Sequence, residues 1–121
     1  YRLPWEQIRM KVAYVAGPYR AENNWLLEQN VRAAEEMGLK LATRGLASIV
    51  PHTMSRYFHG TLTETYWLAA TQELVKRCDI MLVLPGWENS SGTLAEIALA
   101  KTIQMPVFYD LEKLCKSYGI G

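Results

Sequence analysis

Short, continuous apolar runs recur along the chain. Residues 11–16 and 79–84 form two such runs, and runs of this length are typical of strands buried on both faces of a parallel sheet. Two shorter runs, at residues 47–50 and 106–109, predict two further strands. We therefore expect four strands, each separated from the next by a segment long enough to hold a helix.

The segments between these runs have helical spacing. The first helix is expected to begin at a cap on Asn23 or Asn24 and to end at Gly45. Residues 62–77 and 93–103 predict two more helices, and a short helix is expected from residue 111 onward. The apolar residues expected to face inward are Leu27, Val31, Ala34, Met37 and Leu41 in the first helix and Trp67, Ala70, Leu74 and Val75 in the second.

The order of these elements predicts a single α/β domain. Alternating strands and helices imply right-handed crossovers and a doubly wound, mostly parallel sheet of four to five strands with helices on both faces, as in Rossmann-like and flavodoxin-like folds. A chain of 121 residues fits one such domain. We expect it to cover residues 10–121, and residues 1–9 to be an upstream extension or a remnant of cloning.

The expected sheet also predicts where a ligand binds. In doubly wound sheets, ligands bind outside the carboxyl ends of the strands, at the point where the strand order reverses. Three segments should meet there: residues 17–24, an expected loop at residues 51–60, and an expected loop at residues 85–92 with the helix start that follows it.

The last of these segments holds the most informative residues. Ser90, Ser91 and Gly92 are small, so their backbone N–H groups can approach an anion closely. Thr93-x-x-Glu96 then places a carboxylate in the expected first turn of the helix. The same spacing fits a capping box, in which Glu96 bonds only the backbone. The sequence leaves the site and the capping interpretations open.

Residues near the first two strands can complete the site. Gly17 gives access to the backbone, and the Arg20 guanidinium can hold a phosphate with two donors, although a solvated surface arginine is the alternative. Tyr14 lies within a strand, and its buried phenol needs a partner, for which Glu96 is a candidate. His52 follows the second strand and is either a site residue or a bystander.

Aromatic side chains are expected around the same cleft. They can stack on a nucleobase or cover a dimer interface, and we expect Trp87 to contact the substrate. The aromatic residues concerned are Tyr57, Phe58, Tyr66 and Trp87.

Composition narrows the range of partners. The formal net charge is +1 and no basic run is present, which argues against nucleic acid as a partner. No apolar run is long enough for a membrane span, and residues 1–9 lack the apolar core of a signal peptide. We expect a cytoplasmic protein with Cys78 and Cys115 as reduced thiols. The sequence contains no metal-ligand pattern and implies no cofactor.

Several motifs together carry a resemblance to a known family. They are Tyr14-Val15-Ala16-Gly17-Pro18-Tyr19-Arg20, Cys78-Asp79 at a strand start, Pro85-Gly86-Trp87, and Ser90-x-Gly92-Thr93-x-x-Glu96. From Met10 to about Glu112, the chain resembles the nucleoside 2-deoxyribosyltransferase superfamily. The resemblance implies an enzyme that breaks a nucleoside N-glycosidic bond, with Glu96 attacking C1′ and Tyr14 orienting it. We expect the helix N-terminus to keep Glu96 ionised.

One position favours a nucleotide as the substrate. In the branch of the superfamily that the chain resembles less, the transferases of free nucleosides, an aspartate lies six residues before the nucleophile. This chain has Ser90 at that position. A serine there resembles the 2′-deoxynucleoside 5′-phosphate N-hydrolases, whose loop binds the 5′-phosphate, and Arg20 matches a phosphate-side arginine of that branch. We expect a 5′-phosphate to be held by Arg20 and by the backbone of Ser90, Ser91 and Gly92.

A second position departs from the family pattern. Family members often carry an aspartate eight residues before the position of Asp79, as an acid or base toward the leaving group or water. This chain has Thr71 there. Glu64, Glu73 or His52 can take over that role, or the protein lacks it.

The expected function is cleavage or transfer at the N-glycosidic bond of a (deoxy)nucleoside 5′-monophosphate. One alternative is a phosphoribohydrolase of the cytokinin-activating type, which shares a Pro-Gly…Gly-Thr-x-x-Glu pattern. Another is a non-catalytic nucleotide-binding module, which the threonine at position 71 favours. We further expect a homodimer or a larger homo-oligomer, because related enzymes often complete each site from a neighbouring subunit.

Overall fold

The fold is built on a four-stranded parallel sheet. The computed structural model describes residues 10–58 and 60–120. Its strands are β1 (Val12–Ala16), β2 (Ala47–Ile49), β3 (Ile80–Val83) and β4 (Val107–Phe108), in the order β2-β1-β3-β4. All neighbouring strands pair in parallel, with Tyr14 opposite Ile49 on one side and opposite Met81 on the other. This confirms the predicted fold class.

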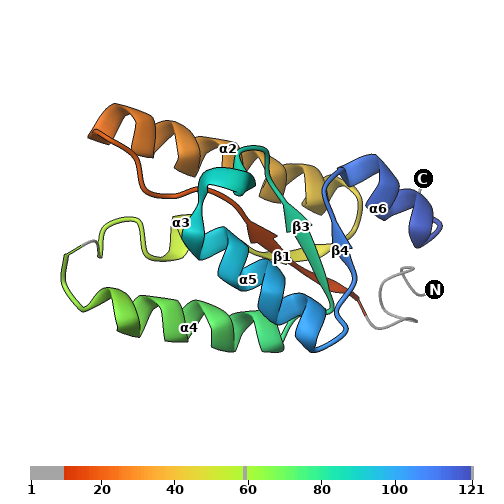
Figure 1. Cartoon of the computed structure of the whole chain (residues 1–121). Helices are drawn as coiled ribbons and strands as arrows, with labels where there is room; N and C mark the ends of the chain where they lie inside the picture. The colour runs from red at the N-terminus through yellow and green to blue at the C-terminus, as the bar shows by residue number, and fades with distance from the viewer. Residues whose placement is uncertain (1–9, 59, 121) are drawn as a thin grey trace.

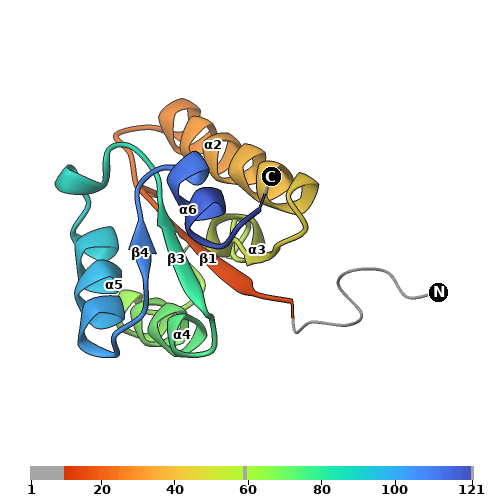
Figure 2. The ribbon, with the colours of Figure 1, turned by 90° about the vertical axis from the view of Figure 1, so that its right-hand side faces the viewer.

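Helices cover both faces of the sheet. The principal helices are α2 (Asn24–Thr43), α4 (Glu64–Lys76), α5 (Ser91–Thr102) and α6 (Leu111–Ser117). Figures 1 and 2 show α2 and α6 on one face of the sheet and α4 and α5 on the other. The strand order reverses between β1 and β3, because the crossover through α2 runs toward β2 and the crossover through α4 returns past β1.

The alternation of side chains along β1 divides the core into two layers. Ala13 and Val15 pack with residues of α2 and α6, whereas Tyr14 and Ala16 pack with residues of α4 and α5. Successive side chains of a strand point to opposite faces. The phenol of Tyr14 is therefore directed to the face that α4 and α5 cover.

The predicted ends of the first helix are confirmed. The Asn23 side chain caps α2 by accepting a hydrogen bond from the Leu26 N–H at 2.9 Å. At the other end, Gly45 has φ +79°, a left-handed conformation that glycine adopts without strain.

Three local predictions were wrong. The expected loop at residues 51–60 begins with the one-turn helix α3 (Pro51–Met54), in which the proline occupies the first turn, where its missing N–H costs nothing. The expected loop at residues 85–92 contains the 3-10 turn η1 (Trp87–Asn89). Helix α5 begins at Ser91 rather than Thr93.

Two further expectations concern the ends of the chain and the membrane. Residues 1–9, interpreted above as an extension or a remnant of cloning, lie outside the described residues. Within the described part of the chain, no helix is long and apolar enough to cross a membrane.

Candidate functional site

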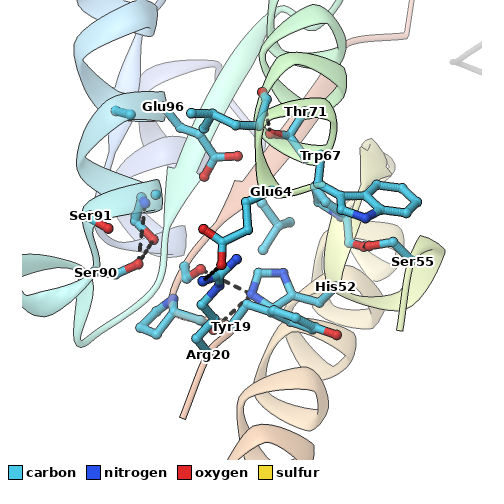
Figure 3. Close-up of a pocket in the computed structure, with 18 of the residues that line it drawn as sticks. Tyr19, Arg20, His52, Ser55, Glu64, Trp67, Thr71, Ser90, Ser91 and Glu96 are labelled. Atoms are coloured by element: carbon cyan, nitrogen blue, oxygen red, sulfur yellow. Dashed lines mark hydrogen bonds and ion pairs between the residues drawn. The ribbon is translucent and has the colours of Figure 1, made fainter. Parts of the chain in front are cut away.

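A cavity of about 740 Å³ opens at the carboxyl ends of β1 and β3. This is the predicted position, where the strand order reverses. Its walls come from the segment after β1, from α3, from the N-terminal half of α4, and from the loop and helix start after β3. Figure 3 shows side chains from all four segments directed around one space.

A buried hydrogen-bonded pair, Tyr14 and Glu96, adjoins this cavity. Tyr14 on β1 is fully buried, and Glu96 on α5 is 9% exposed. The Tyr14 hydroxyl donates a hydrogen bond to Glu96 Oε2. Glu96 lines the cavity, so its carboxyl group is shared between the phenol behind it and the open space in front. The predicted partnership of these two residues is confirmed.

The protonation of Glu96 differs from the expectation. Burial raises the pKa of Glu96 from its ordinary 4.5 to about 7, and the hydrogen bond from Tyr14 opposes this rise. Proximity to the helix N-terminus therefore does not keep the carboxylate fully ionised. Burial, and then the charge of Glu96, raise the pKa of Tyr14 far above its ordinary value, so Tyr14 remains a hydrogen-bond donor.

The capping interpretation of Glu96 is wrong. Ser90 caps α5: its Oγ accepts from the Thr93 N–H at 3.3 Å and from the Thr93 hydroxyl at 2.8 Å. Thr93 is therefore the third residue of the helix, and Glu96 lies in the second turn. Its carboxylate is not part of a capping box, which removes the structural alternative to a role in the site.

The start of α5 offers fewer donors than expected. The Ser90 N–H donates to the Trp87 carbonyl at 3.1 Å, so this backbone group already has an acceptor. Ser91 and Gly92 occupy the first two helical positions, whose N–H groups have no acceptor within the helix. Both residues line the cavity. Of the three backbone N–H groups predicted to bind an anion, those of Ser91 and Gly92 remain available.

Arg20 lines the same cavity but already has a partner. Its guanidinium forms an ion pair with Glu64, the first residue of α4. The two side chains are 61% and 74% exposed, and exposed ion pairs are weak because water screens them. Figure 3 shows the pair lying between the Glu96 and His52 sides of the cavity. Arg20 is therefore present at the site with a largely exposed side chain.

His52 holds the backbone of the cavity wall. Its Nε2 lies 3.1 Å from the Gly17 carbonyl and 2.9 Å from the Pro18 carbonyl. Both groups are acceptors, so Nε2 carries the hydrogen. Burial lowers the pKa of His52, with the two carbonyls opposing the effect. His52 is a neutral, 5% exposed side chain that fixes the turn after β1.

Gly17 is required by packing. A Cβ at this position would lie 2.7 Å from Leu84 Cδ1 and 2.8 Å from Leu84 Cβ, so a change of the Leu84 rotamer alone cannot relieve the clash. Gly17 lines the cavity, as expected. Its lack of a side chain lets the segments that follow β1 and β3 come together there.

The aromatic residues expected around the cleft lie outside the lining of the cavity. Trp87 is not among the residues that line the cavity, and its ring packs on Tyr109 with centroids 5.1 Å apart. Tyr57, Phe58 and Tyr66 are absent from the lining as well. The aromatic side chains that do line it are Tyr19 and Trp67.

Thr71 and Glu64 are also brought to the site. Thr71 lines the cavity, donates to the Leu68 carbonyl at 3.0 Å, and lies close enough to Tyr14 to oppose the rise of that residue's pKa. Glu73, by contrast, forms ion pairs with Lys76 and Arg77 outside the cavity lining. Among residues 10–58 and 60–120, no cluster of three or more His, Cys, Asp or Glu side chains is suited to a metal ion.

Comparison with known proteins gives the family. The family model described as a domain of unknown function, DUF4406, matches residues 10–109. The chain belongs to the DUF4406 family. The match includes all four strands and every residue that lines the cavity, so this site lies within the DUF4406 domain itself. No curated protein matches the chain.

Proposed function

We propose that this protein cleaves, or transfers across, the N-glycosidic bond of a (deoxy)nucleoside 5′-monophosphate, with Glu96 as the nucleophile. The observation that carries the proposal is the buried hydrogen bond from Tyr14 to Glu96, whose side chain lines a cavity at the switch point of the sheet. The sequence resemblance to the nucleoside 2-deoxyribosyltransferase superfamily assigns the same two residues to the nucleophile and its orienting phenol.

The environment of Glu96 suits a nucleophile that works at neutral pH and above. Its pKa of about 7 leaves a large fraction ionised near neutrality. The Tyr14 hydroxyl stabilises the ionised form and fixes one carboxylate oxygen, which leaves the other for C1′. In the retaining reaction, a bond from the carboxylate oxygen to C1′ forms as the bond from C1′ to the base breaks.

The cavity also suits a phosphorylated ligand. Its volume of about 740 Å³ falls in the range of small-molecule sites. Ser91 and Gly92 at the start of α5 and the largely exposed side chain of Arg20 line it. Helix-start N–H groups and guanidinium groups bind anions. The phosphate is therefore assigned to Ser91, Gly92 and Arg20, with the Ser90 side chain shaping the helix start.

A non-catalytic nucleotide-binding module is the second candidate. The observation in its favour is Thr71, which occupies the position of the acid–base aspartate in the nucleoside 2-deoxyribosyltransferase superfamily. Its hydroxyl donates to the Leu68 carbonyl. A threonine hydroxyl is too weak an acid and too weak a base for general acid–base catalysis near neutral pH. A module of this kind would bind the same nucleotides in the same cavity and release no base.

The two candidates are separated by base release. Purified protein is incubated with deoxyribonucleoside and ribonucleoside 5′-monophosphates and with the matching nucleosides, and free base is measured by mass spectrometry. We expect release by the wild type, and loss of release in Glu96→Gln. Glu73→Gln, an exposed change outside the cavity lining, serves as the control. Binding without release supports the module, and strict dependence on ribose supports the phosphoribohydrolase alternative.

A further inference from the structure

N-glycosidic cleavage requires a second group that handles protons. The departing base takes up a proton, and the attacking water gives one up. Glu96 cannot transfer these protons while it is bonded to C1′. This chain has Thr71 where the nucleoside 2-deoxyribosyltransferase superfamily has an acid–base aspartate. If the proposed function holds, another residue must therefore transfer the protons.

The structure removes most of the alternatives. His52 donates its Nε2 hydrogen to two backbone carbonyls, and its Nδ1 is buried without a partner among the described residues. Glu73 lies outside the cavity lining and is bound to Arg77. Of the described residues that line the cavity, Glu64 and Glu96 carry the carboxyl groups.

Glu64 lines the same cavity as Glu96. It is the first residue of α4, capped by the Thr63 side chain, and α4 packs against α5, which carries Glu96. Figure 3 shows both carboxyl groups directed into the cavity from these two helices. The Glu64 side chain is 74% exposed, so water and a departing base can both reach it.

The ion pair with Arg20 links Glu64 to the substrate. Arg20 is also the residue assigned to the 5′-phosphate, and a phosphate carries more charge than a carboxylate. The pair is exposed and weak, so a bound phosphate can take Arg20 from Glu64. The carboxyl group of Glu64 is then free of its ion pair while the nucleotide is bound.

We propose that Glu64 is the second catalytic carboxylate of this site and that it takes the place of the aspartate missing at position 71. The assignment rests on the proposed function. In the first step, Glu64 gives its proton to a ring nitrogen of the base while the C1′–N bond breaks and a Glu96 oxygen bonds to C1′. In the second, a water oxygen attacks C1′, the bond to Glu96 breaks, and the water's proton passes to Glu64.

The test compares natural and activated leaving groups in Glu64→Gln. The substrates are the best nucleotide from the base-release panel and the same sugar phosphate carrying p-nitrophenol at C1′, which departs without protonation. We expect turnover of the nucleotide to fall about 100-fold or more, the usual contribution of general acid catalysis. The activated substrate should release a burst of p-nitrophenolate equal to the enzyme present, followed by slow turnover that azide accelerates.

Controls keep the result interpretable. Glu73→Gln on the same helix should behave as the wild type with both substrates, and thermal unfolding should show that both variants fold. Near-normal nucleotide turnover by Glu64→Gln, or an equal loss of the first step with both substrates, overturns the role of Glu64 and leaves that of Glu96 intact. Absence of Glu96-dependent turnover in the wild type overturns the proposed function, and this role with it.

Discussion

The hydroxyl of Tyr14 on β1 donates a hydrogen bond to the carboxyl group of Glu96 on α5, 82 residues later in the chain. Both side chains are buried, yet Glu96 borders a cavity large enough for a nucleotide. A carboxyl group in this position costs free energy when it ionises and gains little from packing. A stable core would be better served by a neutral residue, so the pair indicates function.

This cost predicts a pH-dependent stability. The pKa of Glu96 is raised in the folded state to about 7, so the stability it contributes is fully present below pH 4.5 and is lost as the pH rises through 7. The loss amounts to about 3 kcal/mol. Glu96→Gln removes the titration. We therefore expect the free energy of unfolding by urea to fall between pH 5 and pH 8 in the wild type and to fall less in Glu96→Gln.

Glu64→Gln is the matched control for this measurement, because it makes the same change at an exposed position. If the unfolding free energies of the wild type and Glu96→Gln change equally between pH 5 and pH 8, burial does not raise the pKa of Glu96.

Tyr14→Phe should raise the pKa of Glu96 further. The hydrogen bond from Tyr14 is the group that opposes the raised pKa of Glu96, so its removal raises that pKa further. The activity of the variant should need a higher pH, with roughly tenfold lower kcat at pH 7. Tyr109→Phe, which changes an exposed tyrosine outside the cavity lining, is the control. A pH–rate profile identical to that of the wild type would exclude the role of Tyr14.

Arg20→Ala should distinguish phosphorylated from unphosphorylated ligands. We expect calorimetric titration to show roughly tenfold weaker binding of a nucleoside 5′-monophosphate, a modest effect because the side chain is exposed. Binding of the nucleoside should change little. If the wild type binds the nucleoside and its 5′-monophosphate equally well, the phosphate assignment is wrong.

We also predict a homodimer or a larger homo-oligomer. Several large apolar side chains between residues 54 and 68 are exposed, and a second copy of the chain can cover them. Light scattering at micromolar concentration should give at least twice the mass of one chain, and Tyr66→Lys should reduce it. A wild-type monomer contradicts this prediction. The side chains concerned are Met54, Tyr57, Phe58, Leu62, Tyr66 and Leu68.

Much of the fold could be predicted because its signals are local. The continuous apolar runs correspond to strands, and the Asn23 cap depends on residues three apart. The Tyr14–Glu96 contact followed from topology, since the ends of adjacent parallel strands and the helix after β3 must meet at the switch point.

The rest of the site depends on tertiary structure. Ser90, Ser91 and Thr93 are all competent caps, and the sequence alone did not choose Ser90. Trp67 had the spacing of a core residue, and only the tertiary structure shows that it lines the cavity. The ion pair between Glu64 and Arg20 likewise joins residues far apart in the sequence.

The most direct test of the nucleophile is to trap it. The wild type is mixed with the nucleotide that gives the fastest base release, quenched with acid, and digested for peptide mass spectrometry. We expect a sugar-phosphate adduct on Glu96, formed together with free base, and no adduct in Glu96→Gln. Release of base by the wild type with no adduct, or an adduct and normal release in Glu96→Gln, would contradict this expectation.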